Sequence, residues 1–372
     1  MKYIEHEFVS VAKRENNPKR NYLVVNRLQG KHVPVAPEIV FEMFDALADR
    51  LQAACKKERL LLIGFAETAT AIGARLAVRL GSYYMQTTRE QIPNAEYLLF
   101  SESHSHATEQ KLVKDDVEKI LPKVDRVVFV EDEVTTGNTI LNIINILEKE
   151  YPDKMRFTVA SVLNGMDAEA KGRYRERQVG LFYLCETNHR QYAAIAEGYN
   201  GDGEYISMDT SCAVPSAVYR LHGYLNSRRC VLGEAYNKAC EALWEQIKAA
   251  VPLDKKQSVL ILGTEEFMYP ALWIGACLEK CGHAVKCHAT TRSPIAVSCE
   301  SDYPLSVRYE LASFYEDGRR TFIYDLKKYD SVWILTDAIN PKENGVCSLI
   351  HALESCGNDD IRLFFWGDNC ET

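Results

Sequence analysis

One segment of the chain carries residues whose order favours binding of a phosphorylated sugar. Residues 127–130 (VVFV) are apolar, Glu131 and Asp132 follow, and a Thr- and Gly-rich stretch leads to apolar-periodic residues from Ile140. This order predicts a buried strand, acidic residues at its end, a tight loop and a helix. Backbone N–H groups at the start of such a helix favour an anion, and a glycine lets the backbone approach it closely.

The same segment predicts a ligand with an anionic and a neutral part. Carboxylates repel a phosphate, so we expect Glu131 and Asp132 to accept hydrogen bonds from vicinal hydroxyls of a sugar. The phosphate is expected on the loop of Glu133, Val134, Thr135, Thr136, Gly137, Asn138 and Thr139. Together these features describe a ribose 5-phosphate. The alternative is an ordinary strand, turn and helix without a ligand.

The composition limits the classes of protein to consider. With 372 residues, 47% hydrophobic and 26% charged, the chain is expected to fold into about two domains rather than a disordered, collagen-like or coiled-coil form. No apolar run approaches the ~20 residues of a membrane span, and the first residues lack the apolar core of a signal peptide. The net charge of −8 argues against nucleic-acid or membrane partners, and 12 cysteines without a C-x-x-C pair suit a reducing, cytoplasmic location.

The order of apolar and chemistry-bearing segments occurs twice. The paired segments are 60–64 with 259–263, 87–89 with 290–292, and 127–132 with 332–337. Short apolar runs alternating with helical stretches are typical of parallel strands with crossover helices. The pattern predicts an α/β fold with a parallel sheet, tandemly repeated with a diverged second copy. Chance similarity between two α/β segments is the alternative.

The repeat also predicts domain boundaries. We expect a first domain over 1–190, in which residues 1–58 supply a hood over the site and an N-terminal helix. A connector over 191–252 and a second domain over 253–372 follow. Ligands of parallel sheets bind at the carboxyl ends of the strands, which is where the motifs fall.

The motifs resemble those of a known family. The pattern Glu-Asp-x-x-Thr-Thr-Gly-x-Thr at 131–139 resembles the signature with which type I phosphoribosyltransferases bind phosphoribosyl pyrophosphate (PRPP). Residues 291–294 (TRSP), 17–20 (NPKR) and 30–34 (GKHVP) resemble the two-domain phosphoribosyltransferases found near tellurite-resistance genes. The resemblance covers most of the chain and implies a type I phosphoribosyltransferase fold, commonly a homodimer. It also implies Mg²⁺-dependent transfer of the phosphoribosyl group of PRPP to a nucleobase-like or heterocyclic acceptor, with release of pyrophosphate.

The resemblance assigns roles to residues of the first domain. Asp132 and Glu131 would hold the ribose hydroxyls, help to stabilise an oxocarbenium-like transition state, and contact Mg²⁺ bound through PRPP. The pyrophosphate would lie against Ala66, Glu67, Thr68, Ala69 and Arg89. A cis peptide bond is expected near Ala66 and Glu67.

Two further groups of residues are weaker candidates. The resemblance also implies a loop that closes over the site, which here would include His104 and His106. Histidines suit proton transfer near neutral pH, and a solvated loop is the alternative. The candidates for acceptor binding, or for the hood, are Arg14, Lys19, Arg20, Lys31 and His32. A solubilising surface cluster is the alternative for these residues.

The second copy lacks the phosphate-binding pattern, because residues 340–344 (NPKEN) replace the Thr/Gly loop. Candidates for binding a different ligand are Glu266, Arg292, Ser293 and Asp337; a purely structural role is the alternative. Two other functions stay open for the whole chain. One is a PRPP-binding sensor without catalysis, and the other is a diphosphoryl transferase resembling PRPP synthetases, which keep the signature in the C-terminal copy.

Overall fold

The structure, a computed structural model, describes residues 3–15, 20–100, 110–152, 155–253 and 256–367. These residues form two compact units. The first comprises Met1–Glu5, Phe41–Asn188 and Leu225–Lys238, and the second comprises His6–Val40, His189–Tyr224 and Ala239–Thr372. Both units are mixed α/β structures built around a mainly parallel sheet, as the sequence predicts.

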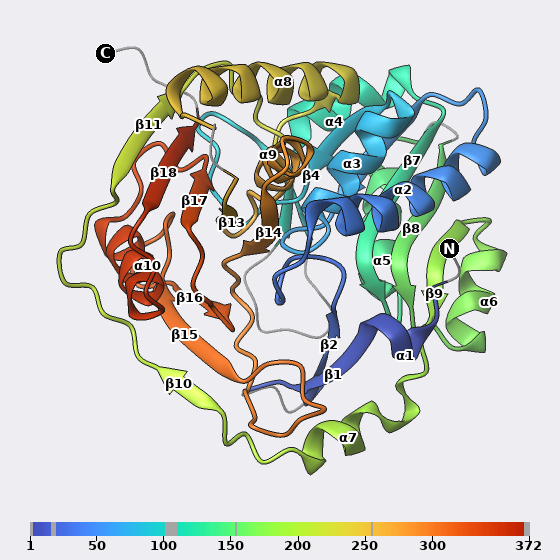
Figure 1. Ribbon diagram of the computed structural model, residues 1–372. Helices are drawn as coiled ribbons and strands as arrows, with labels where there is room; N and C mark the ends of the chain where they lie inside the picture. Colours follow the sequence, from blue (N-terminus) through green and yellow to red (C-terminus); the bar gives the residue numbers. More distant parts are fainter. Residues whose placement is uncertain (1–2, 16–19, 101–109, 153–154, 254–255, 368–372) are drawn as a thin grey trace. The chain divides into compact units, whose positions relative to one another are not determined.

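The first unit contains a six-stranded sheet in the order β12-β4-β3-β7-β8-β9 (Figure 1). All neighbours are parallel except β12 and β4. The strands are β3 (Leu60–Gly64), β4 (Tyr83–Gln86), β7 (Arg126–Val134), β8 (Arg156–Asn164), β9 (Gly180–Glu186) and β12 (Val231–Leu232). Every residue of β3 is buried, which explains its uninterrupted apolar sequence.

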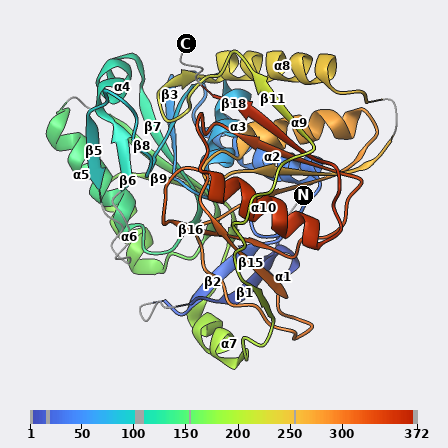
Figure 2. The ribbon, with the colours of Figure 1, turned by 90° about the vertical axis from the view of Figure 1, so that its left-hand side faces the viewer.

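Helices and a small hairpin complete the first unit. The helices are α3 (Thr70–Leu80), α4 (Lys114–Ile120), α5 (Asn138–Glu150) and α6 (Ala168–Glu176), with the 3₁₀ turn Leu121–Lys123. The strands β5 (Tyr97–Phe100) and β6 (Gln110–Val113) pair as an antiparallel hairpin, and α5 packs against β5 (Figure 2). Helix α5 buries Ile140, Ile143, Ile144 and Leu147, the helical periodicity that the sequence shows.

The second unit has its own parallel sheet, in the order β11-β18-β17-β13-β14 (Figure 1). These strands are β11 (Ala217–Leu221), β13 (Ser258–Gly263), β14 (Ala284–Ala289), β17 (Ser331–Thr336) and β18 (Ile361–Trp366). A second sheet holds β10 (Glu204–Ile206), β15 (Val307–Ala312) and β16 (Arg320–Tyr324). The helices are α7 (Tyr192–Gly198), α9 (Tyr269–Lys280) and α10 (Glu343–Ser355), with the 3₁₀ turn His189–Gln191.

The N-terminal segment belongs mainly to the second unit. Its strands β1 (Val9–Lys13) and β2 (Tyr22–Asn26) form an antiparallel hairpin. Ala12 and Val25 of this hairpin are buried in one apolar cluster with Phe322 and Tyr324 of β16. The compact units therefore divide the chain differently from the boundaries that the sequence repeat predicts.

Three helices contain residues of both units or lie at the boundary between them. They are α1 (Glu5–Phe8), α2 (Pro37–Ala54) and α8 (Gly233–Ala250). Within the part of the chain that the structure describes, no helix combines the length and apolar character needed to cross a membrane.

The two parallel sheets share a strand order. In the first, β3 lies between β4 and β7, and in the second, β13 lies between β14 and β17. In each sheet the chain first moves to one side of the central strand and then to the other. The point where the direction changes is where parallel α/β sheets bind ligands, at the carboxyl ends of the strands.

A buried ion pair attaches residues 225–238 to the first unit, and this attachment is testable. The Asp116 carboxylate accepts hydrogen bonds from Arg229 Nε (2.8 Å), Arg229 Nη2 (3.0 Å) and the Cys230 N–H (2.9 Å). We expect Asp116→Ala to destabilise the first unit by about 2–4 kcal/mol, because it leaves a half-buried guanidinium without its carboxylate. Urea unfolding measures this loss. The neighbouring Asp115→Ala is the control, and equal stability of the two variants would contradict the assignment.

Candidate functional site

The signature segment forms the end of β7, a short turn and the start of α5. Strand β7 continues to Val134, because Glu133 and Val134 still pair with Leu163 and Asn164 of β8. The predicted phosphate loop is therefore shorter than expected: Glu133 and Val134 are strand residues, and only residues 135–137 lie between β7 and α5. Gly137, with φ of 68°, is the N-cap of α5.

The conformation of this turn requires glycine. A Cβ atom on Gly137 would lie 2.4 Å from the Tyr174 hydroxyl and 2.5 Å from Met166 Cε. The Tyr174 hydroxyl donates a hydrogen bond to the Gly137 carbonyl (2.8 Å), and Arg173 Nη2 donates to the Thr136 carbonyl (3.3 Å). Helix α6 thus stabilises the turn through hydrogen bonds to two of its carbonyls. No local sequence signal indicates these contacts.

The two acidic residues of the signature have different surroundings. Successive residues of a strand point to opposite faces, so Glu131 and Asp132 diverge. Asp132 is partly buried and interacts with the Thr68 hydroxyl, which donates to it. Burial and the nearby charge of Glu133 raise the pKa of Asp132 to about 6. Glu131 lies near Tyr174, whose pKa is raised by burial and by that carboxylate.

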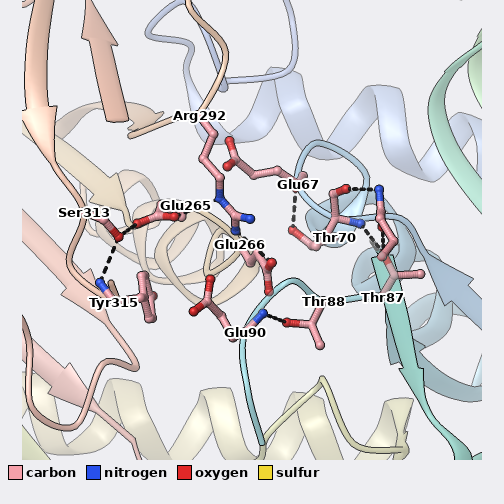
Figure 3. A network of polar contacts seen from close by, with 12 residues as sticks. Glu67, Thr70, Thr87, Thr88, Glu90, Glu265, Glu266, Arg292, Ser313 and Tyr315 are labelled. Carbon is pink, nitrogen blue, oxygen red and sulfur yellow. Dashed lines mark hydrogen bonds and ion pairs between the residues drawn. The ribbon is translucent and has the colours of Figure 1, made fainter. Parts of the chain in front are cut away.

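The predicted pyrophosphate loop follows β3 and lies beside the end of β7. The Phe65 N–H donates to the Val130 carbonyl (3.1 Å), and the Ala69 N–H donates to the Phe65 carbonyl (3.0 Å). The peptide bond between Ala66 and Glu67 is cis, which confirms the expectation from the family resemblance. Thr70 Oγ1 donates to the Glu67 carbonyl (3.2 Å) at the start of α3 (Figure 3).

Residues after β4 contact the same loop. Thr87 Oγ1 accepts a hydrogen bond from the Ala66 N–H (2.8 Å; Figure 3). Arg89, a predicted pyrophosphate ligand, follows two residues later and is partly buried. Its segment is held by Thr88, whose hydroxyl accepts from the Glu90 N–H (2.9 Å; Figure 3). The structure therefore places residues 66–69, Arg89 and Asp132 at the carboxyl edge of one sheet.

The remaining candidates from the N-terminal half of the chain fall into two groups. His104, His106 and Lys19 are outside the described residues. Arg14, Arg20, Lys31 and His32 belong to the second unit. Lys31 is completely buried, and its Nζ donates to the carbonyls of Glu265 (3.1 Å) and Thr290 (2.8 Å).

In the second unit, the predicted ligand-binding residues are bonded to one another or to their neighbours. Arg292 bridges two buried carboxylates, with Nε 2.8 Å from Glu265 and Nη2 2.8 Å from Glu266 (Figure 3). Ser293 follows Arg292, and its carbonyl accepts a hydrogen bond from the Tyr324 hydroxyl (2.6 Å). These contacts organise the ends of β13 and β14.

Asp337, at the end of β17, has both carboxylate oxygens occupied. The Tyr224 hydroxyl donates to Oδ2 and the Tyr315 hydroxyl to Oδ1, each at 2.7 Å. Helix α10 begins after Lys342, an extended residue, where α5 begins after a left-handed glycine. The second unit therefore lacks the turn found after β7, as its sequence predicts.

The described residues contain no group of three or more His, Cys, Asp or Glu side chains arranged to hold a metal ion. Glu131 and Asp132 nevertheless offer the carboxylate oxygens that Mg²⁺ prefers. Mg²⁺ commonly binds through one or two carboxylates together with substrate phosphates. The donor set therefore fits a metal that arrives with a phosphorylated ligand.

Two family models match successive parts of the chain. Residues 8–187 match a model described as phosphoribosyl transferase, and residues 222–353 match the TRSP domain that lies C-terminal to that transferase. The chain therefore belongs to this two-domain phosphoribosyl transferase family, an enzyme family, which confirms the prediction from its motifs. No curated protein sequence matches the chain.

Solved structures give distant similarities that cover about half of the chain. Adenine phosphoribosyltransferase from Rhodothermus marinus has 16% identity and a TM-score of 0.37, covering 49% of this chain and 96% of that one. The Giardia lamblia enzyme complexed with 9-deazaadenine has 15% identity and a TM-score of 0.36, covering 50% and 96%. The Trypanosoma brucei enzyme has 16% identity and a TM-score of 0.36, covering 48% and 76%.

The turn before α5 yields one prediction. We expect Gly137→Ala to weaken PRPP binding at least tenfold and to destabilise the first unit by about 1–3 kcal/mol, since the new Cβ collides with Tyr174 at a positive φ. Titration calorimetry and thermal unfolding measure the two effects. Gly172→Ala on α6 is the control, because a Cβ there meets no atom within 4 Å. Equal PRPP affinity and equal thermal stability of the two variants would contradict the requirement for glycine at position 137.

The raised pKa of Asp132 yields another prediction. The pKa of Asp132 is about 6 in the folded protein and 3.8 ordinarily, so the folded state binds the proton more tightly. The protein therefore loses folding stability as the pH rises between these two values. Asp132→Asn should therefore gain roughly 1–3 kcal/mol of stability at pH 7 and little at pH 4. Thermal unfolding at the two pH values tests this expectation. A variant that is less stable than the native chain at pH 7 would contradict it.

Proposed function

We propose that this chain transfers the 5-phosphoribosyl group of PRPP to a nitrogen of a nucleobase-like or heterocyclic acceptor and releases pyrophosphate. The observation that carries the proposal is the succession of Asp132 at a strand end, a turn with a left-handed Gly137, and the N-terminus of α5. A 13-residue helix directs backbone N–H groups and its positive dipole end toward this turn, which favours a phosphate.

The residues of the first unit suit the separate parts of PRPP. In our proposal, the turn at 135–137 and the first residues of α5 hold the 5-phosphate. Asp132 accepts hydrogen bonds from ribose hydroxyls and, above its pKa of about 6, supplies negative charge beside the cationic transition state. The loop of residues 66–69, with Arg89, binds the departing pyrophosphate. Arginine suits this role because its planar guanidinium binds phosphate bidentately.

We further propose that a carboxylate of the signature, Asp132 or Glu131, holds Mg²⁺ together with oxygens of PRPP. When bound, the ion neutralises charge that develops on the departing pyrophosphate. Asp132 is the better placed of the two to respond to the metal, since its burial already makes its ionisation costly. A nearby cation would lower that cost and favour the carboxylate form.

We propose that the second unit is a diverged copy of the first that has no phosphoribosyl site of its own. The shared order of the central strands supports a repeat. Asp337 corresponds to Asp132 in that repeat, yet it already accepts hydrogen bonds from two tyrosine hydroxyls. Catalysis would then reside in the first unit, and a homodimer remains our expectation for the assembly.

Titration of PRPP with Mg²⁺ tests the proposed function. We expect binding to the native chain, binding weakened at least tenfold in Asp132→Asn, and native binding in Asp337→Asn, the matched control from the second unit. Pyrophosphate release with a panel of nucleobases should identify the acceptor, and Asp132→Asn should lower kcat by roughly 10²–10³. PRPP binding without release for any acceptor would favour a sensor. PRPP formation from ATP and ribose 5-phosphate would favour a diphosphoryl transferase.

A further inference from the structure

We propose that Thr87 and Gln110 are positioning residues that hold the backbone N–H and carbonyl of Ala66, and with them the pyrophosphate side of the site, in their binding geometry. This inference rests on the proposed function. Neither residue belongs to the signature segment or to the loop itself. Their role follows from a closed set of hydrogen bonds with Ala66.

The three residues form a ring of hydrogen bonds. The Ala66 N–H donates to Thr87 Oγ1 (2.8 Å), the Thr87 hydroxyl donates to Gln110 Oε1, and Gln110 Nε2 donates to the Ala66 carbonyl (2.9 Å). Each side chain both donates and accepts, so only one orientation of the Gln110 amide completes the ring. The reverse orientation would place its oxygen against the Ala66 carbonyl.

The ring is buried, which makes its completeness important. Thr87, Gln110 and Ala66 are 0%, 2% and 6% exposed. A buried polar group that loses its partner costs about 1–3 kcal/mol, and a satisfied network in a low-dielectric site is correspondingly rigid. The backbone of Ala66 is therefore held by two side chains, one at its N–H and one at its carbonyl, in addition to its covalent neighbours.

The ring is attached to strand ends. Thr87 follows β4, and its N–H donates to the Gly64 carbonyl at the end of β3 (2.9 Å). Gln110 begins β6, and the next residue exchanges two backbone hydrogen bonds with Thr88 (3.0 and 3.1 Å). A group supported by paired strands is placed more accurately than one supported by a loop alone.

The position of Ala66 determines where the following residues lie. Thr68, two residues later, interacts through its hydroxyl with Asp132 on β7. The ring thus fixes one end of a short loop that also contacts the acid of the signature. Because an error of about 1 Å in placing a reacting group can cost 10²-fold in rate, a loop held at this point would favour transfer.

Ligand titrations with matched variants separate a positioning role from a merely structural one. Thr87→Val and Gln110→Leu break the ring, whereas Thr87→Ser keeps the hydroxyl. Gln86→Leu is the control for stability. Gln86 is as buried as Gln110, but it lies on β4 outside the ring, and its side chain accepts a hydrogen bond from Ser227 (2.9 Å). The probes are inorganic pyrophosphate and ribose 5-phosphate, each with Mg²⁺, and PRPP in turnover.

We expect Thr87→Val and Gln110→Leu to weaken pyrophosphate binding at least tenfold and to lower kcat/KM for PRPP by about 10²-fold. Their affinity for ribose 5-phosphate should stay within threefold, as should all ligand affinities of Thr87→Ser and Gln86→Leu. Native pyrophosphate affinity in the two ring-breaking variants would overturn the positioning role while leaving the proposed function intact. Equal losses for both probes, or equal losses in Gln86→Leu, would show a structural role only. A native chain that binds neither PRPP nor pyrophosphate would overturn both proposals.

Discussion

The parallel pairing of β3 with β4 on one side and β7 on the other is the constraint on which the candidate site depends. It aligns the carboxyl ends of three strands that are far apart in the sequence. Backbone hydrogen bonds continue the alignment past the strands, from Phe65 to Val130 and from Thr87 to Gly64. The loop after β3 and the acid of β7 consequently share one edge of the sheet. A shift of one residue in the pairing of β3 with β4 or with β7 would turn the side chains of the shifted strand to the other face of the sheet, so that the loop and the acid would no longer face one ligand.

Three acids of the first unit, Glu58, Asp125 and Asp132, are shifted in pKa in opposite directions. Asp125 accepts hydrogen bonds from Arg59, which lower its pKa to about 2, and Glu58 has its pKa lowered by Arg126. Asp132 is shifted in the opposite direction by burial and by Glu133. The ionised carboxylate of Glu58 or Asp125 is favoured by its arginine partner in the folded state, whereas the ionised carboxylate of Asp132 costs stability. Such a cost is typical of groups retained for binding or catalysis.

The second unit shows that the same strand order can carry different side chains at its strand ends. At its strand ends, Asp337 is bonded by two tyrosine hydroxyls, and Arg292 joins Glu265 to Glu266. These polar groups satisfy one another within the protein. In the first unit the corresponding positions hold a turn that demands glycine and an acid with a raised pKa. The difference lies in the side chains at the strand ends, because the backbone order is shared.

The sequence by itself determined the α/β class, the signature at 131–139, the family and the absence of that signature from residues 332–344. These features are local, since they depend on apolar periodicity and on the residues of one turn. Only the tertiary structure decided that Ala12 and Val25 pack in the second unit, and that β8 extends β7 to Val134. It also decided the ring around Ala66 and the direction of the Asp132 pKa shift. Burial and hydrogen-bond partners arise from contacts between distant segments, which periodicity and spacing do not encode.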